Sequence, residues 1–333
     1  MKIKRLLLTG FLLAAAIVLA AGVGYGSARA VFAISDEAVN IPDPVLENAI
    51  RDGLDIHGRD IRASDMARIN KLVIGNNIGA IGETGDIVAS LEGLEYCLNL
   101  EEININGDIS DLTPLRNLDK LESLMVTGHV RDLTPLANLT NLKHLFLMHH
   151  DISDISPLAN LTSLEALMLS INQIQDISPL GNLRSLRSLS LDDNRISDIS
   201  VLANLGNLQQ LSITRNQIAD ISSLARLEQL FSLHAYKNQI EDITPLAGLY
   251  RLENLGLEEN QIRDISSLSG LYRLRNISLN SNDIADISPL IENRGFTDME
   301  LERRLDVNDN PLNAESINIC IPELAKSGIK VSY

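Results

Sequence analysis

The chain has 333 residues, of which 45% are hydrophobic and 3% aromatic, and it carries a formal net charge of −16 at pH 7. A protein this acidic repels the phosphate backbone of a nucleic acid and the headgroups of an anionic membrane. The composition therefore argues against both as partners. A charge that serves only to keep the protein soluble is the alternative explanation.

The first 30 residues have the three parts of a secretory signal peptide. Three basic residues stand within the first five positions, an uncharged and mostly apolar run covers residues 6–23, and small residues precede a cleavage site at Ala30 or Ala33. We therefore expect export, and a protein that is secreted or held at the cell surface. Because the apolar run is just long enough to span a bilayer, an uncleaved anchor that tethers the protein to the membrane is the alternative.

From Leu100 onward the sequence repeats itself with a period of 21 or 22 residues. Each unit contains an apolar-x-apolar pair, and nine regular pairs begin at Ile103, Leu124, Leu145, Leu167, Leu189, Leu211, Leu233, Leu255 and Ile277. A period this regular predicts a solenoid whose units bury their apolar residues against their neighbours. The alternation predicts short parallel strands whose leucines point inward and whose middle residues point out of a concave face.

An asparagine decides where the tenth strand lies. In the six complete repeats an Asn follows the second apolar residue by three positions, and Asn310 stands in that relation to Val307. The pair Met299 and Leu301 would keep the 22-residue step but lacks this asparagine. We therefore expect Leu305 and Val307 to form the tenth strand, after a six-residue insertion.

The recurring asparagine is expected to hydrogen-bond the backbone of the turn after each strand and so to form a ladder along the array. His150 takes its place in the third repeat. The predicted ladder consists of Asn172, Asn194, Asn216, Asn238, Asn260, Asn282 and Asn310.

A second recurring motif, Asp-Ile/Leu-Ser/Thr, follows the asparagine turn, and proline comes next in six units. We interpret the Ser or Thr as the N-cap of a short 3-10 or α-helical turn on the convex side, with proline at its first position. The recurring aspartates would then belong to turn and cap chemistry, and a strip of cation-binding carboxylates is the alternative. They are Asp111, Asp132, Asp154, Asp176, Asp198, Asp220, Asp242, Asp264 and Asp286.

The repeating unit L-x-x-L-x-x-L-x-L-x-x-N-x-I-x-D-I-S-P-L resembles that of the internalin family of bacterial leucine-rich-repeat proteins. The resemblance implies an α/β solenoid, a right-handed leucine-rich-repeat superhelix with a concave parallel sheet, convex 3-10 or short helical turns and helical caps at both ends. Residues 41–50 are similar to the family's N-terminal helical cap, with Asp43 as N-cap, Pro44 at N1 and Gly53 as C-cap. Residues 314–326 resemble its helical closing cap.

These patterns divide the chain into a signal peptide over 1–30, an N-terminal helical cap with an inserted loop over 34–89, a repeat array of about ten strands over 90–309 and a C-terminal cap over 310–333. Cys97 and Cys320 lie at opposite ends of the array. Strands spaced by about 4.8 Å put them more than about 40 Å apart, whereas a disulfide needs Cα atoms within about 7 Å. We expect two separate, buried thiols.

Catalytic chemistry is not evident in the sequence. His144, His149, His150 and Asp151 form its densest group of metal-ligand side chains, but adjacent residues of a strand face opposite ways and no cysteine or second carboxylate completes a zinc site. The sequence contains no Gly-x-Ser-x-Gly, phosphate-loop or His-Glu-x-x-His motif. We therefore expect neither enzymatic activity nor a metal or other cofactor.

The repeats differ mainly in the residues that should face out of the concave sheet. Met125, Phe146 and Met168 occupy three consecutive middle positions, and Met148 lies beside them. Exposed apolar clusters are typical of interaction sites, so we expect these residues at the centre of a binding surface and acidic residues at its polar rim. The predicted surface is Met125, His144, Phe146, Met148, Met168, Ile171, Asp192, His234, Tyr236 and Glu258, with Asp192 and Glu258 in the rim. Coverage of the first strands by the N-terminal cap or by a second copy of the chain is the alternative.

The sequence thus predicts an exported scaffold that recognises an extracellular or cell-envelope protein, or a glycan, through its concave face. Neither nucleic acid nor, after signal removal, a membrane is an expected partner. The alternative is a structural or self-associating envelope component, such as a homodimer, without a separate ligand.

Overall fold

The computed structural model describes residues 36–75, 87–293, 295 and 303–333. The chain divides into two units, Met1–Ile34 and Ser35–Tyr333, and every described helix and strand belongs to the second unit. The expected signal peptide, residues 76–86 of the inserted loop and most of the insertion before the tenth predicted strand lie outside the described residues.

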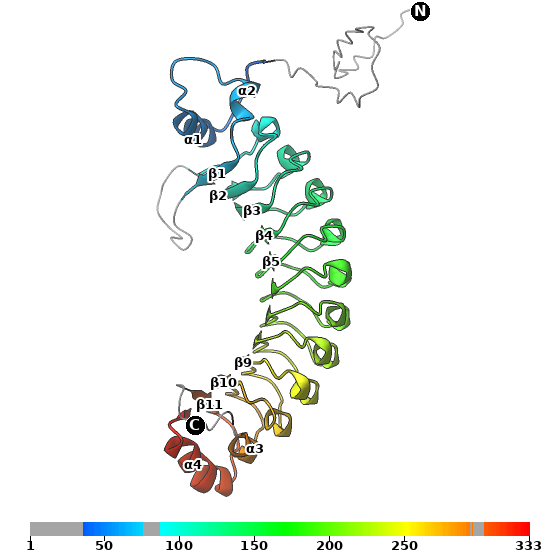
Figure 1. Cartoon of the computed structure of the whole chain (residues 1–333), viewed down its shortest axis with the longest axis vertical. Helices are drawn as coiled ribbons and strands as arrows, with labels where there is room; N and C mark the ends of the chain where they lie inside the picture. Colours follow the sequence, from blue (N-terminus) through cyan, green and yellow to red (C-terminus); the bar gives the residue numbers. More distant parts are fainter. Residues whose placement is uncertain (1–35, 76–86, 294, 296–302) are drawn as a thin grey trace, which may run out of the picture. The chain divides into compact units, whose positions relative to one another are not determined.

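The described residues of this unit form a solenoid with twelve parallel strands in one sheet, each paired with the next along the chain (Figure 1). Leu145 pairs with Leu167 and Leu167 with Leu189, so the repeated leucines are in register and point inward together. This confirms the predicted fold class. The strands are β1 (Lys71–Ile74), β2 (Glu102–Ile109), β3 (Ser123–Gly128), β4 (His144–Phe146), β5 (Ala166–Met168), β6 (Ser188–Ser190), β7 (Gln210–Ser212), β8 (Ser232–His234), β9 (Asn254–Gly256), β10 (Asn276–Ser278), β11 (Arg304–Asp306) and β12 (Lys330–Ser332).

The two ends of the sheet differ from the repeat pattern. Leu305 pairs with Ile277, so β11 is the tenth strand that Asn310 marks in the sequence. Beyond the ten strands, β1 adds one at the N-terminal end and β12 one at the C-terminal end. Leu72 of β1 precedes its partner Ile103 by 31 residues and Val331 of β12 follows its partner Leu305 by 26, so neither strand fits the 21- or 22-residue period and periodicity does not reveal them. Each supplies backbone partners to a strand that would otherwise expose an unpaired edge.

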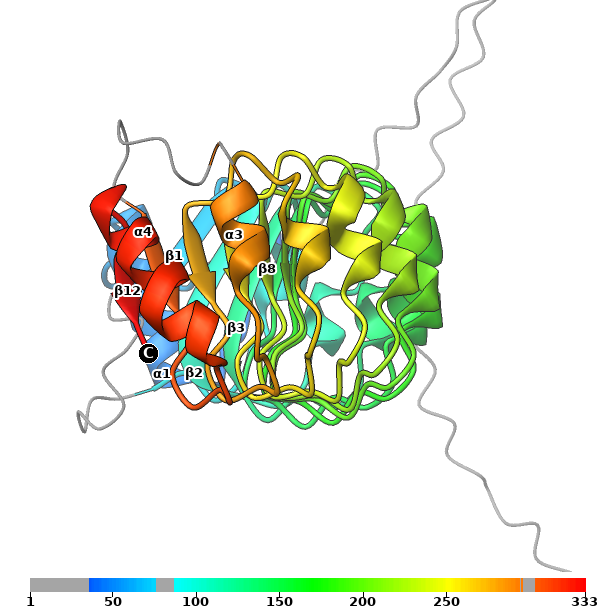
Figure 2. The same cartoon turned by 90° about the horizontal axis from the view of Figure 1, so that it is seen from below.

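Short helical turns form the convex side, opposite the sheet (Figures 1 and 2). In all nine units a carboxylate oxygen of the recurring aspartate accepts a hydrogen bond from the backbone N–H of the Ser or Thr two residues later, as Asp176 does from Ser178 at 2.8 Å. The turns are η1 (Leu94–Tyr96), η2 (Thr113–Leu115), η3 (Thr134–Leu136), η4 (Ser156–Leu158), η5 (Ser178–Asn182), η6 (Ser200–Asn204), η7 (Ser222–Arg226), η8 (Thr244–Gly248), η9 (Ser266–Leu268) and α3 (Ser288–Glu292).

The assignment of Ser or Thr as the capping side chain is therefore wrong. The aspartate supplies the capping oxygen because its side chain reaches the N–H two residues ahead, and the Ser or Thr is the first residue of the turn. Hydrogen bonds from the backbone and the hydroxyl of Ser178 hold the pKa of Asp176 below its ordinary value. The repeated aspartates thus have a structural role in each turn.

The asparagine ladder runs between the sheet and these turns. Oδ1 of Asn194 accepts from the N–H of Ile174 in the preceding repeat at 3.0 Å, and its Nδ2 donates to the carbonyl oxygens of Leu169 and Leu191, both at 3.0 Å. Each ladder asparagine thus satisfies backbone groups of its own repeat and of the one before it. The same acceptor contact is made by Asn172, Asn194, Asn216, Asn238, Asn260, Asn282 and Asn310.

Asp43 joins the N-terminal helix to the start of the array. Its Oδ1 accepts from the N–H groups of Val45 and Leu46 in the first turn of α1 (Pro44–Leu54), and its Oδ2 accepts from Ala89 at 2.7 Å and Ser90 at 3.2 Å. Burial raises the pKa of this carboxyl, but the four N–H donors outweigh that effect and hold the pKa below its ordinary value.

The other helix ends are set locally. The expected C-cap at Gly53 is wrong: α1 continues to Leu54, and Asp55 adopts the left-handed conformation, with φ 54°, that ends it. A single turn, α2 (Ala63–Met66), follows before β1. At the other end, η10 (Ser316–Cys320) and α4 (Ile321–Lys326) precede β12.

The core consists of the inward leucines and isoleucines of every repeat, almost all of them fully buried. Burying one such side chain contributes about 1.5–3 kcal/mol, which a single repeat could not collect without its neighbours. Cys97 and Cys320 are buried free thiols within this core, and burial raises the pKa of Cys97 to about 12.

Candidate binding surface

The predicted apolar residues lie in one row across three neighbouring strands of the concave face. Met125 of β3 pairs in register with Phe146 of β4, and Phe146 pairs with Met168 of β5. Each remains partly exposed, as does Met148 just after β4, so the described residues of the N-terminal cap do not bury them. We call Met125, Phe146, Met148 and Met168 the apolar row.

An aromatic stack stiffens the centre of this row. The rings of His144 and Phe146, two positions apart on β4, are parallel within 3° with their centroids 6.4 Å apart. Both side chains point out of the sheet, since their positions alternate with the buried Leu145. A partner would therefore meet Phe146 in a restrained orientation.

Ile171 extends the apolar surface from an unfavourable backbone conformation. It is 49% exposed, and its φ is 57°. A β-branched side chain is strained in this left-handed region, in which asparagine, aspartate and histidine are enriched among the non-glycine residues. The equivalent positions of later repeats carry Asp193, Arg215 and Lys237. The fourth repeat thus presents an apolar side chain at a position where the third repeat has His149 and the later repeats have charged or polar residues.

Asp192, expected in the polar rim, is held within the sheet. Its Oδ1 accepts from the hydroxyl of Ser212 at 2.6 Å and from the N–H of Thr214 at 2.8 Å, and its Oδ2 accepts from Ser190 at 3.0 Å. These bonds tie β6 to β7 and occupy both oxygens. Asp192 therefore separates the apolar row from the later repeats rather than offering a free acceptor.

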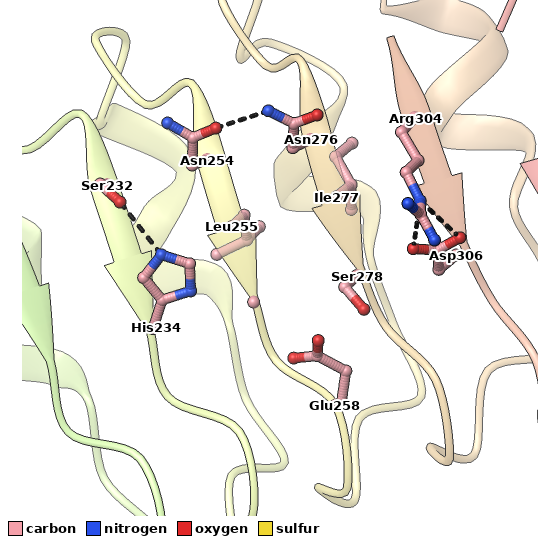
Figure 3. A pocket seen from close by; sticks show the side chains of 11 residues that line it. Ser232, His234, Asn254, Leu255, Glu258, Asn276, Ile277, Ser278, Arg304 and Asp306 are labelled. Carbon is pink, nitrogen blue, oxygen red and sulfur yellow. Dashed lines mark hydrogen bonds and ion pairs between the residues drawn. The ribbon is translucent and has the colours of Figure 1, made fainter. Parts of the chain in front are cut away.

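The remaining predicted residues gather in the later repeats. The guanidinium of Arg215 lies over the ring of Tyr236, 5.6 Å from its centroid, and so occupies one face of that ring. His234 and Glu258 line a pocket of about 330 Å³ that spans β8 to β11 (Figure 3). The structure thus divides the predicted surface into an apolar half on β3–β5 and a polar half on β8–β11.

Sequence reasoning missed several residues of the polar half. Asn254, Asn276 and Arg304 each stand two positions before the last residue of their strand and also line the pocket. Nδ2 of Asn276 donates to Oδ1 of Asn254 at 2.7 Å, and Nε of Arg304 lies 2.8 Å from a carboxylate oxygen of Asp306 (Figure 3). The sequence signal was Gly256, a middle position without a side chain, which leaves the pocket open.

The histidine cluster does not converge. His150 turns inward into the asparagine ladder and is buried, whereas the neighbouring His149 is exposed with φ 62°. Within the described ranges, no three His, Cys, Asp or Glu side chains gather in an arrangement suited to a metal ion.

Of the helices described, none is both long and apolar enough to cross a membrane.

Comparison with known proteins identifies the repeats and the scaffold. A family model described as leucine-rich repeats (two copies) matches residues 140–182 and 184–226. A search of curated protein sequences found no significant match.

Solved structures match over most of the chain. Internalin InlF of Listeria monocytogenes is 34% identical with a TM-score of 0.76, and the match covers 88% of this chain and 91% of InlF. Internalin C2 of the same organism is 34% identical with a TM-score of 0.57, over 74% of this chain and 98% of that one. The leucine-rich-repeat ectodomain of the Arabidopsis thaliana receptor kinase GASSHO1/SCHENGEN3, in complex with Casparian strip integrity factor 2, shares the fold at 23% identity and a TM-score of 0.57, over 66% of this chain and 31% of that one.

Proposed function

Since the chain belongs to the internalin family of bacterial leucine-rich-repeat proteins, we propose that it is an exported scaffold that binds a protein partner through its concave face. The partner is an extracellular or cell-envelope protein, and the scaffold contributes a shaped surface rather than a catalytic group. Export is supported by the order of charged start, apolar run and small-residue site in the first 33 residues.

The apolar row carries this proposal. A soluble protein seldom leaves a contiguous group of large apolar side chains open without an interaction to explain it. Parallel strands place the three middle side chains about 5 Å apart, which makes a continuous strip. Methionine adapts its shape to a partner, and phenylalanine is enriched at interface centres. We therefore place Phe146, stacked on His144, at the centre of the contact.

Capture of a partner tests the proposal directly. The exported chain, immobilised and exposed to surface extracts of the source cells, should retain a specific protein that Phe146→Ala retains at least about thirtyfold more weakly, the effect of losing a hot spot of about 2 kcal/mol. Tyr250→Ala is the matched control, because this tyrosine is 64% exposed and lies outside the concave strands. Thermal stability of the variants must match that of the parent.

Three outcomes would overturn the proposal. Equal capture by Phe146→Ala and the parent would remove the apolar row from the binding site. Retention of a glycan in place of a protein would change the partner class. Concentration-dependent dimerisation that Phe146→Ala abolishes, with no partner retained, would identify a self-associating component instead.

A further inference from the structure

The polar pocket on β8–β11 exists because Gly256 has no side chain. A Cβ at this position would lie 3.0 Å from Nδ1 of His234 and 3.2 Å from Oε2 of Glu258. Both contacts are tighter than ordinary packing, so a side chain here would fill the space that these two polar atoms border. The absence of that side chain opens a notch in the floor of the pocket.

One carboxylate oxygen in this notch is left without a partner. Oε2 of Glu258 is shielded from solvent, and the described part of the chain places no donor within hydrogen-bond distance of it. A shielded carboxylate oxygen without a donor lowers the stability of the folded protein, and the free-energy cost is larger than for an unpaired neutral group. Figure 3 shows the Glu258 carboxylate between His234 and Ser278, and the side chain as a whole is half-buried and lines the pocket.

The neighbouring charges do not neutralise Glu258. Arg304, the guanidinium that lines the pocket, is bound by its Nε to both oxygens of Asp306, at 3.1 and 2.8 Å. His234 has its Nε2 3.3 Å from the hydroxyl of Ser232. The Ser232 hydroxyl can accept from Nε2 or donate to it, so Nδ1 borders the notch as an acceptor in one tautomer and as a donor in the other. The pocket therefore offers the carboxylate of Glu258, for which the described residues supply no charged partner.

We propose that this pocket is an anchor subsite for a basic side chain, the ammonium of a lysine or the guanidinium of an arginine, presented by the protein partner. An ammonium supplies three donors and a guanidinium five, and either brings the positive charge that the carboxylate of Glu258 lacks beside it. The net charge of −16 favours approach of such a partner. The subsite rests on the proposed binding function and gives it a specificity: an apolar contact at β3–β5 and a basic residue at β8–β11.

Model compounds test the subsite without the partner. Nα-acetyl-lysine N-methylamide, its arginine counterpart, its norleucine counterpart and methyl glucoside are titrated into the protein while amide resonances of Gly256 and its neighbours are followed by NMR. We expect one of the two basic compounds, and not norleucine, to shift these resonances with a salt-sensitive dissociation constant. The stronger of the two identifies the side chain.

Variants separate the pocket from general attraction to an acidic protein. Glu258→Gln should weaken binding of the basic compound about tenfold, the loss expected for one charge-assisted hydrogen bond. Gly256→Ala should weaken it by filling the notch. Glu259→Gln is the matched control: it removes the same charge from the next residue, whose carboxylate faces Lys237 at 3.7 Å, and should change the constant by less than about twofold.

Equal shifts with norleucine, shifts with methyl glucoside alone, or a basic compound bound equally well by Glu258→Gln would each overturn the subsite. Because Gly256→Ala could perturb its strand, its melting temperature is compared with that of the parent, and Glu258→Gln decides the matter. These titrations use no partner. If the pocket binds neither basic compound, the subsite is wrong, and the role of Phe146 is still tested separately by the capture experiment.

Discussion

His150 accepts a hydrogen bond through Nδ1 from the backbone N–H of Val130, at 3.1 Å, while its Nε2 lies 3.1 Å from the carbonyl oxygen of Val126. These contacts reproduce, with an imidazole, the acceptor and the donor that asparagine presents in the later repeats. They require the neutral ring with its proton on Nε2, because a protonated Nδ1 cannot accept. In the third repeat the ladder contact is therefore made by a group whose protonation depends on pH.

We expect His150 to make the protein less stable in acid. Burial lowers the pKa of His150, and His129 and His149 lower it further, so the unfolded chain binds the proton more readily. The stability is present above the unfolded pKa of about 6.5 and is lost as pH falls through the folded pKa, by at most about 1.4 kcal/mol per pH unit. His150→Asn should remove this dependence.

Denaturant unfolding at about pH 7.5 and about pH 5 measures the effect on either side of the ordinary histidine pKa. His149→Asn is the control, since this histidine is exposed and its φ of 62° suits asparagine. The same acid-induced loss in the parent and in His150→Asn would contradict the assignment.

Asn216→Ala should destabilise the solenoid far more than Asn207→Ala. Oδ1 of Asn216 accepts from Ile196 at 3.0 Å and its Nδ2 donates to Leu191 and Ile213, whereas the exposed Asn207 donates to Arg184 at 2.9 Å. Each buried backbone group left unpaired costs about 1–3 kcal/mol. Urea midpoints at an unchanged slope measure the difference. Matching midpoints would mean that the ladder contributes little.

Ile171→Asn should raise stability and lower partner capture. Relief of a β-branched residue from the left-handed region is worth about 1–2 kcal/mol, while the loss of its exposed side chain narrows the apolar surface. Lys237→Asn, at the equivalent position with φ 56° and an unbranched Cβ, should gain less and leave capture unchanged. Thermal unfolding and capture are measured together. A destabilised Ile171→Asn would show that the isoleucine packs favourably where it is.

Gly128→Ala should be strongly destabilising. Gly128 has φ 137°, and a Cβ there would overlap the backbone N and O of Ile109 on the neighbouring strand. Backbone cannot move aside as a flexible side chain can, so the pairing of β2 and β3 would have to shift. Gly206→Ala, with open space around the added methyl, is the control. Calorimetry that finds the two variants equally stable would rule out this close approach.

The periodic features of this protein can be predicted from the amino-acid pattern alone. The spacing of leucines such as Leu167 determined the register of the sheet, and Asn310 placed β11 correctly across an insertion. These assignments succeed because each repeat uses the same local pattern of strand, asparagine turn and helical turn. Stacking identical patterns brings equivalent residues together without further information.

The contacts between a residue and the neighbouring repeat could not be predicted in this way. Asp192 has the sequence position of a free rim acceptor, but Ser212 and Thr214 of the next repeat occupy its oxygens. Gly256 is one small residue among the middle positions of the strands, yet it lies between His234 and Glu258 and opens the pocket. Such a contact depends on the side chain of a residue about twenty positions away in the sequence, which lies about 5 Å away on the neighbouring strand. The repeat period predicts where that residue lies but not which amino acid it is.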